Sequence, residues 1–137
     1  MKLYYAPGSC ALSPPIVLEE AGLAYTLDKV NLKTKQTASG DDFTALNPKG
    51  YVPALQLDDG TVLTEGPAIV QYLADLVPAK ALAPANGTLP RYQLQSWLTF
   101  IGTELHKQFS PLFSPTTPED IRKAQIDKLQ KRFAYVA

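Results

Sequence analysis

The single cysteine of this 137-residue chain, Cys10, stands between two segments of different character. The apolar, aromatic residues 2–6 precede it, and a helix-forming stretch follows it beyond Pro14 and Pro15. At the entrance of a helix, unpaired N–H groups and the positive end of the dipole stabilise a thiolate. The position therefore predicts a reactive thiol. A small, buried apolar side chain is the other interpretation, because free cysteines are among the most buried residues.

Cys10 lacks a resolving partner, since Ser13 takes the place of the second cysteine in a Cys-x-x-Cys redox motif. The thiol cannot close an internal disulfide, but it can form a mixed disulfide with an external thiol or donate a hydrogen bond to one. The two adjacent prolines add an expectation about the backbone. They delay the helix until Ser13 caps it, which would leave Cys10 one turn ahead of the helix.

A second motif is the dipeptide Val52-Pro53, which follows a loop and opens an apolar run. A cis peptide bond there would hold Val52 extended, with its N–H and C=O free. Such an edge can pair with a peptide-like ligand as an added strand. A proline that merely opens a strand is the alternative.

A third motif is Thr64-Glu65-Gly66-Pro67, which ends a strand and opens a helix. The N–H of Gly66 would lie at a positive helix end and suit a carboxylate, while Glu65 could accept a ligand ammonium. A capping arrangement without any ligand is the alternative.

The elements that must position these motifs form an α/β pattern in the first half of the chain. A strand that alternates Tyr25 and Leu27 follows the first helix, which Gly22 closes. Asp-Gly between two short apolar runs predicts a hairpin. The expected order is a strand at 2–6, a helix at 16–22, a strand at 24–32, a short helix at 42–47, a hairpin within 52–66 and a helix at 67–77.

The pattern of the second half predicts helices only. The proline- and alanine-rich stretch 77–88 precedes a helix at 89–107, residues 110–120 break it, and Thr117, Pro118 and Asp120 signal the next helix. We therefore expect an α/β domain at 1–78, a linker at 79–88 and an all-helical domain at 89–137. The expected apolar stripes are Leu94, Trp97, Leu98, Ile101 and Leu105 on one helix, and Ile126, Leu129, Phe133 and Val136 on the next.

Composition excludes several classes of protein. Lys+Arg and Asp+Glu are 13 each, unlike the basic footprint of a nucleic-acid-binding protein. No apolar run is long enough to span a bilayer, and the N-terminus lacks the apolar core of a signal peptide. One cysteine and one histidine argue against a structural zinc site, and the lone cysteine fits a reducing compartment. We therefore expect a cytoplasmic protein with no metal, no nucleic-acid partner and no membrane segment.

Taken together, "MKLYYAPGSCALSP", "NPKGYVPAL", "DDGTVLTEGPAIVQYLAD" and "WLTFIGTELHK" resemble a bacterial beta-class glutathione S-transferase. The resemblance implies a thioredoxin-like N-terminal domain (βαβ-α-ββα) and an all-helical domain, here incomplete because family members continue with further helices. It also implies glutathione as co-substrate, small hydrophobic electrophiles as second substrates, a role in detoxification and a homodimer.

The resemblance also assigns roles to the three motifs. Cys10 would contact the sulfur of glutathione as a catalytic residue and form a mixed disulfide with it. The backbone of Val52, before Pro53, would pair with the cysteinyl part, and Glu65 and Gly66 would hold the γ-glutamyl end.

The resemblance also implies roles for one lysine and for residues of the helix at 89–107. Lys35 would reach the glycine carboxylate of glutathione. Thr99, Thr103 and Glu104 would contact glutathione or the electrophile, and His106 would be a second catalytic residue.

The predicted activity is conjugation of glutathione to small electrophiles through a stabilised thiolate. Two alternatives stay open: a glutathione-dependent thiol–disulfide reductase that uses a Cys10 mixed disulfide, and a non-catalytic binding module with the same fold.

Overall fold

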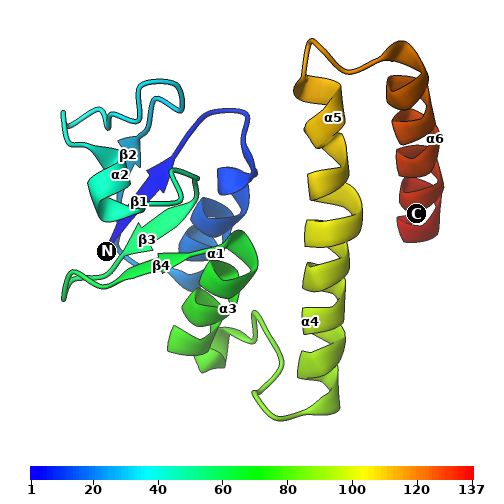
Figure 1. The fold of residues 1–137 in the computed structure, drawn as a ribbon. Coiled ribbons are helices and arrows are strands. Elements are labelled where there is room, and N and C mark those ends of the chain that lie inside the picture. The colour runs from blue at the N-terminus through cyan, green and yellow to red at the C-terminus, as the bar shows by residue number, and fades with distance from the viewer. The chain divides into compact units, whose positions relative to one another are not determined.

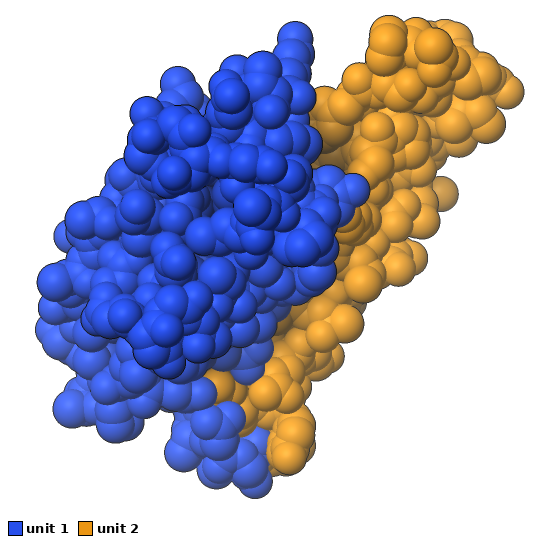
Figure 2. Space-filling view, turned by 60° about the vertical axis from the view of Figure 1, so that its left-hand side comes forward, with its two compact units in different colours: residues 1–88 blue, residues 89–137 orange.

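The computed structural model describes residues 1–137, which form two compact units. Residues 1–88 make up unit 1 and residues 89–137 make up unit 2, coloured separately in Figure 2. Each unit is described by itself.

A four-stranded mixed sheet organises unit 1 (Figure 1). The strands are β1 (Lys2–Tyr5), β2 (Thr26–Lys29), β3 (Ala54–Gln56) and β4 (Val62–Thr64), in the order β2-β1-β3-β4. The β1–β2 pair is parallel, and the β1–β3 and β3–β4 pairs are antiparallel. Together with the helices between them, these strands confirm the predicted order βαβ-α-ββα.

Helices cover both faces of the sheet, so unit 1 has a hydrophobic cluster on each side (Figure 1). Helices α1 (Ser13–Ala21) and α3 (Gly66–Leu76) pack on one face, and the short α2 (Phe43–Leu46) packs on the other. A short 3-10 turn, η2 (Pro78–Lys80), follows α3. The first cluster consists of Leu3, Leu18, Leu55, Ile69 and Leu73, and the second of Tyr4, Ala6, Ala11, Val30, Phe43, Val52 and Ala54.

Two glycines act as the sequence predicted. Gly60 closes the β3–β4 hairpin with φ 87°, and Leu57 donates to the Thr61 carbonyl across the loop at 2.8 Å. Gly22 ends α1 in the left-handed conformation, with φ 69°. Both positions need a positive φ that a side chain would strain.

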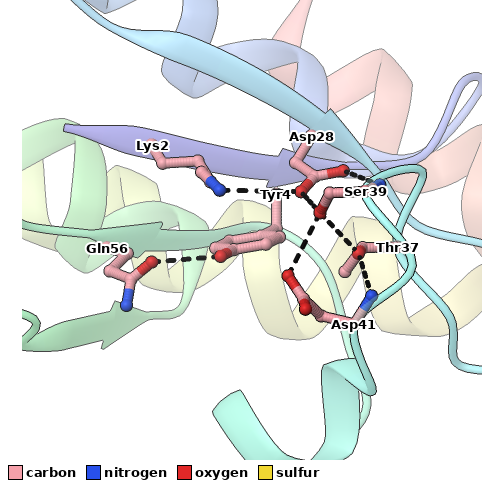
Figure 3. A network of polar contacts seen from close by, with 7 residues as sticks. All are labelled: Lys2, Tyr4, Asp28, Thr37, Ser39, Asp41 and Gln56. Atoms are coloured by element: carbon pink, nitrogen blue, oxygen red, sulfur yellow. Dashed lines mark hydrogen bonds and ion pairs between the residues drawn. The ribbon is translucent and has the colours of Figure 1, made fainter.

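The prediction that Leu27 lies on the buried face of β2 is wrong. Leu27 is 50% exposed, whereas Asp28 is 6% exposed. The Ser39 hydroxyl donates to the Asp28 carboxylate at 2.6 Å, and Lys2 lies 3.8 Å from it (Figure 3). Asp28 is therefore buried because polar partners compensate its lost hydration.

The same network ties the polar loop after β2 to the sheet. Thr37 and Ser39 share a hydroxyl hydrogen bond of 2.9 Å, and the Asp41 N–H donates to the Thr37 hydroxyl at 3.0 Å (Figure 3). Nearby, the Tyr4 hydroxyl donates to Gln56 at 3.0 Å, and burial raises the pKa of Tyr4. The loop that carries Lys35 is thus held at its far end by partly buried hydrogen bonds.

Unit 2 consists of helical segments, with one break at residues 114–118. Its elements are α4 (Leu89–Phe100), the π-helical segment η3 (Ile101–Leu105), the 3-10 turn η4 (His106–Phe109), α5 (Ser110–Phe113) and α6 (Glu119–Val136). The break predicted to start at residue 110 starts only after Phe113, because Pro111 lies in the first turn of α5, where it removes no helical hydrogen bond. No helix is both long and apolar enough to cross a membrane.

The two predicted apolar stripes are only partly buried. Leu105 and Leu129 are buried, whereas Ile126, Phe133 and Val136 are 45–48% exposed. The aromatic contacts Trp97–Tyr135, Phe100–Tyr135 and Phe109–Phe133 join α6 to the helices before it, with ring centroids 5.4–6.2 Å apart.

Candidate functional site

Cys10 begins a separate 3-10 turn, η1 (Cys10–Leu12), rather than the α-helix itself. Ser9 is the N-cap of this turn, and its hydroxyl accepts the Ala11 N–H at 3.2 Å. The thiol is exposed, so the interpretation of Cys10 as a buried apolar side chain is wrong.

Helix α1 begins at Ser13, one short turn beyond Cys10, as the pair of prolines predicted. Ser13 is not its cap, however. Leu12 occupies the N-cap position and has no side-chain hydrogen bond to the helix. Pro14 stands in the first turn, where its missing N–H costs little.

The Cys10 thiol lies beside the second motif. Its Sγ donates to the Val52 carbonyl oxygen at 3.6 Å, and the Val52-Pro53 peptide bond is cis. The Val52 side chain is buried in the cluster below α2, while its N–H donates to no protein group. The thiol therefore faces main-chain groups of the kind that pair with an extended peptide.

The third motif lies next to the first two. Glu65 occupies the N-cap position of α3 with φ 72° and ψ 115°, which is rare for a residue with a side chain. A Cβ placed on Gly66 would lie 3.9 Å from both the Pro53 ring and the Ser13 hydroxyl. Segments far apart in the sequence thus converge at the start of α3.

The Lys35 side chain contacts the loop that precedes Val52. Its backbone has a φ of 60°, and its ammonium donates to the Gly50 carbonyl at 2.9 Å, two residues before Val52. The neighbouring Lys33 is exposed, and its ammonium has no partner. The structure therefore separates the two lysines: only Lys35 points to the Val52 segment.

Lys49 was missed by the sequence analysis. Its ammonium lies 2.9 Å from a Glu65 carboxylate oxygen and 3.1 Å from the Thr64 hydroxyl. The pair is 16 residues apart and joins a loop to a helix start, so no periodic pattern could reveal it.

The predicted residues of unit 2 gather around η3. Thr99 and Thr103 are exposed one turn apart, and their hydroxyls donate to the carbonyls four residues earlier, at 2.8 and 3.0 Å. His106 is exposed at the junction of η3 and η4. Glu104 points elsewhere, since its carboxylate lies 2.9 Å from Arg132 of α6. Single π-helical turns are frequent at functional sites.

A shallow depression of about 400 Å³ lies elsewhere in unit 1, between Met1, Lys2 and the hairpin loop. None of the predicted site residues lines it.

Comparison with known proteins adds to this geometry. Residues 8–76 match the family model described as glutathione S-transferase, N-terminal domain. The chain is 52% identical over 136 residues to glutathione S-transferase GstA of Escherichia coli O157:H7, covering 99% of this chain and 68% of that protein. The chain belongs to the glutathione S-transferase family. The resemblance drawn from the sequence is thereby confirmed.

Solved structures of glutathione S-transferases share the fold. A ternary complex of BphK, a bacterial enzyme, superposes with a TM-score of 0.96 at 60% identity, covering 99% of this chain and 68% of that one. A sphingomonad glutathione S-transferase complexed with glutathione gives 0.95 at 47% identity, with the same coverage. The predicted thioredoxin-like domain followed by a helical region is confirmed, while the roles of individual site residues stay predictions.

Proposed function

We propose that this glutathione S-transferase binds glutathione along the Val52 segment and presents its thiolate to small hydrophobic electrophiles. One observation carries the proposal. The exposed Cys10 thiol lies 3.6 Å from the carbonyl of Val52, a residue whose N–H has no protein partner. An extended tripeptide that pairs with Val52 would bring its own sulfur to Cys10.

The flanking charges suit the two ends of glutathione. Glu65 and the Gly66 N–H lie at the start of α3, where an amino-acid head group finds both an anion and a donor. Lys35, anchored on the Gly50 carbonyl, lies near the Val52 segment and would bind the glycine carboxylate. The Cys10 thiol then donates a hydrogen bond to the glutathione thiolate and stabilises it for attack.

Three residues of unit 2 are further candidates. Thr99, Thr103 and His106 present exposed side chains on or next to η3 and would contact glutathione or the electrophile. Glu104 is paired with Arg132, which favours a supporting role within unit 2 over direct ligand contact.

Titration calorimetry with glutathione, together with a conjugation assay on an aryl chloride, tests the proposal. Saturable binding and glutathione-dependent release of chloride are expected. A chain that binds no glutathione would be a non-catalytic relative, and the proposal would fail.

Thiol–disulfide exchange is a second activity that the exposed Cys10 thiol favours. The Cys10 thiolate would attack one sulfur of oxidised glutathione, form a mixed disulfide and release the other half as a thiolate. Mass spectrometry after incubation with oxidised glutathione should show this adduct on the wild type and none on Cys10→Ala. Conjugation that persists in Cys10→Ala would separate the two activities.

We further propose a cytoplasmic role in detoxification and a homodimer. The half-exposed apolar side chains of α6 support self-association, because such groups gain from burial against another surface.

A further inference from the structure

We propose that Lys49 is a specificity-determining residue, which binds the α-carboxylate of the γ-glutamyl group while Glu65 binds its ammonium. The inference rests on the proposed binding of glutathione and names a residue that the sequence motifs did not include.

The loop places Lys49 firmly at the start of α3. Asn47 is buried and accepts the Lys49 N–H at 3.2 Å, while its side-chain amide donates to the Tyr51 carbonyl at 2.8 Å. From this loop the Lys49 ammonium reaches the Glu65 carboxylate at 2.9 Å. The hydrogen-bonded turn therefore fixes the Lys49 backbone within reach of the proposed head-group position.

The start of α3 has few donors of its own for a carboxylate. Pro67 has no N–H, and the N–H groups of Ala68 and Ile69 both donate to the Glu65 carbonyl at 3.0 Å. Among the first residues of the helix, only the Gly66 N–H is left for a ligand. Lys49, the cation in contact with the Glu65 side chain, can supply a second, charged donor to a bound carboxylate.

An ion pair is complementary to a zwitterion. The side chains of Lys49 and Glu65 are 52% and 67% exposed, so their mutual attraction is weak and they can part at little cost. A γ-glutamyl head group carries one ammonium and one carboxylate. Its ammonium takes the place of Lys49 on Glu65, and its carboxylate receives Lys49 and the Gly66 N–H. One exposed ion pair is thus replaced by two ion pairs and one charge-assisted hydrogen bond.

Calorimetry on the 137-residue chain with two ligands tests this role. The ligands are glutathione and its 4-aminobutyryl analogue, which keeps the ammonium but lacks the α-carboxylate. Lys49→Met should raise the Kd for glutathione about tenfold, as the loss of one charge-assisted hydrogen bond predicts. The same variant should leave the Kd for the analogue unchanged.

Two control variants test whether the effect depends on the positive charge at position 49. Lys49→Arg keeps the cation and should retain most of the affinity for glutathione. Lys29→Met removes an exposed lysine of β2 that has no ion pair and should change neither Kd.

Equal weakening of both ligands by Lys49→Met would show that Lys49 only orients Glu65 or the loop, and would overturn the inference. Tighter binding of glutathione would show that Lys49 competes with the ligand and would overturn it too. Wild-type protein that binds glutathione while Lys49→Met binds equally well refutes only the role of Lys49. Failure of the wild type to bind refutes the proposed function as well.

Discussion

At the scale of single residues, the two lysines of the polar loop have different environments although they stand two positions apart. Lys35 is half-buried and anchored on the Gly50 carbonyl, while Lys33 extends into solvent. Residue type alone does not distinguish them, although the family resemblance assigns the glycine carboxylate to Lys35. The hydrogen bond of the Lys35 ammonium to the Gly50 carbonyl distinguishes them, because it holds that side chain near the Val52 segment.

Lys35→Met should raise the Kd for glutathione about tenfold, since a charge-assisted hydrogen bond to the glycine carboxylate is lost. The glycyl ethyl ester of glutathione lacks that charge, so the variant and the wild type should bind it alike. Lys33→Met is the matched control and should behave as wild type with both ligands. A larger effect of Lys33→Met than of Lys35→Met in calorimetry would reverse the assignment.

The sequence indicated Cys10, Val52, Glu65 and Gly66 as candidates because each sits at a junction marked by glycine or proline. Lys49 carries no such mark. It becomes visible only when the turn at Asn47 and the start of α3 are placed in space.

At the scale of elements, α2 connects the loop of Lys35 to the loop of Val52. Its N-cap Asp42 accepts hydrogen bonds from both the Thr44 hydroxyl and the Thr44 N–H on one carboxylate oxygen, at 2.6 and 2.8 Å. The hydroxyl first, and then the backbone N–H, lower the pKa of Asp42.

A lowered pKa means that Asp42 stabilises the fold above its ordinary pKa near 3.8, and that this contribution is lost as the pH falls through the lower folded-state value. Asp42→Asn keeps the capping oxygen but not the charge. Its Tm should lie below that of the wild type at pH 7, and the gap should close as the pH drops below 4. Asp127→Asn, on the exposed surface of α6, should show no such gap. A gap that widens in acid would contradict the assignment.

Phe43 fixes α2 to the sheet, since it is fully buried and its ring lies 5.6 Å from that of Tyr4. Phe43→Ala should lower the free energy of unfolding by about 3–5 kcal/mol, from lost burial and the cavity left behind. Phe113→Ala, at a side chain that is 81% exposed, should change it by less than about 0.5 kcal/mol. Urea denaturation measures both, and similar losses would contradict the packing described.

Element prediction succeeded where turn chemistry or apolar spacing was strong. The β3–β4 hairpin carries Asp-Gly, and the apolar spacing of Ile69, Val70, Leu73 and Leu76 predicts α3, in which Ile69 and Leu73 are buried whereas Leu76 is 44% exposed. It failed on the face of β2, because alternation counts apolar residues and cannot foresee that Ser39 and Lys2 compensate a buried Asp28.

At the scale of the whole molecule, apolar side chains on α6 remain half-exposed. Ile126 and Phe133 stand seven residues apart and therefore share one side of the helix. The proposed self-association would bury them. Replacing both by serine should weaken association about tenfold or more in sedimentation velocity, because each loses the gain from burial. Serine at Asp127 and Lys131 is the control. If both pairs of substitutions leave association unchanged, another surface forms the dimer.

The most direct test of the glutathione site is an amide NMR titration of the chain with glutathione. We expect saturable shifts at the N–H groups of Val52 and Gly66, which have no protein partner, together with a shift at Cys10. Shifts confined to other parts of the chain, or none at all, would contradict it.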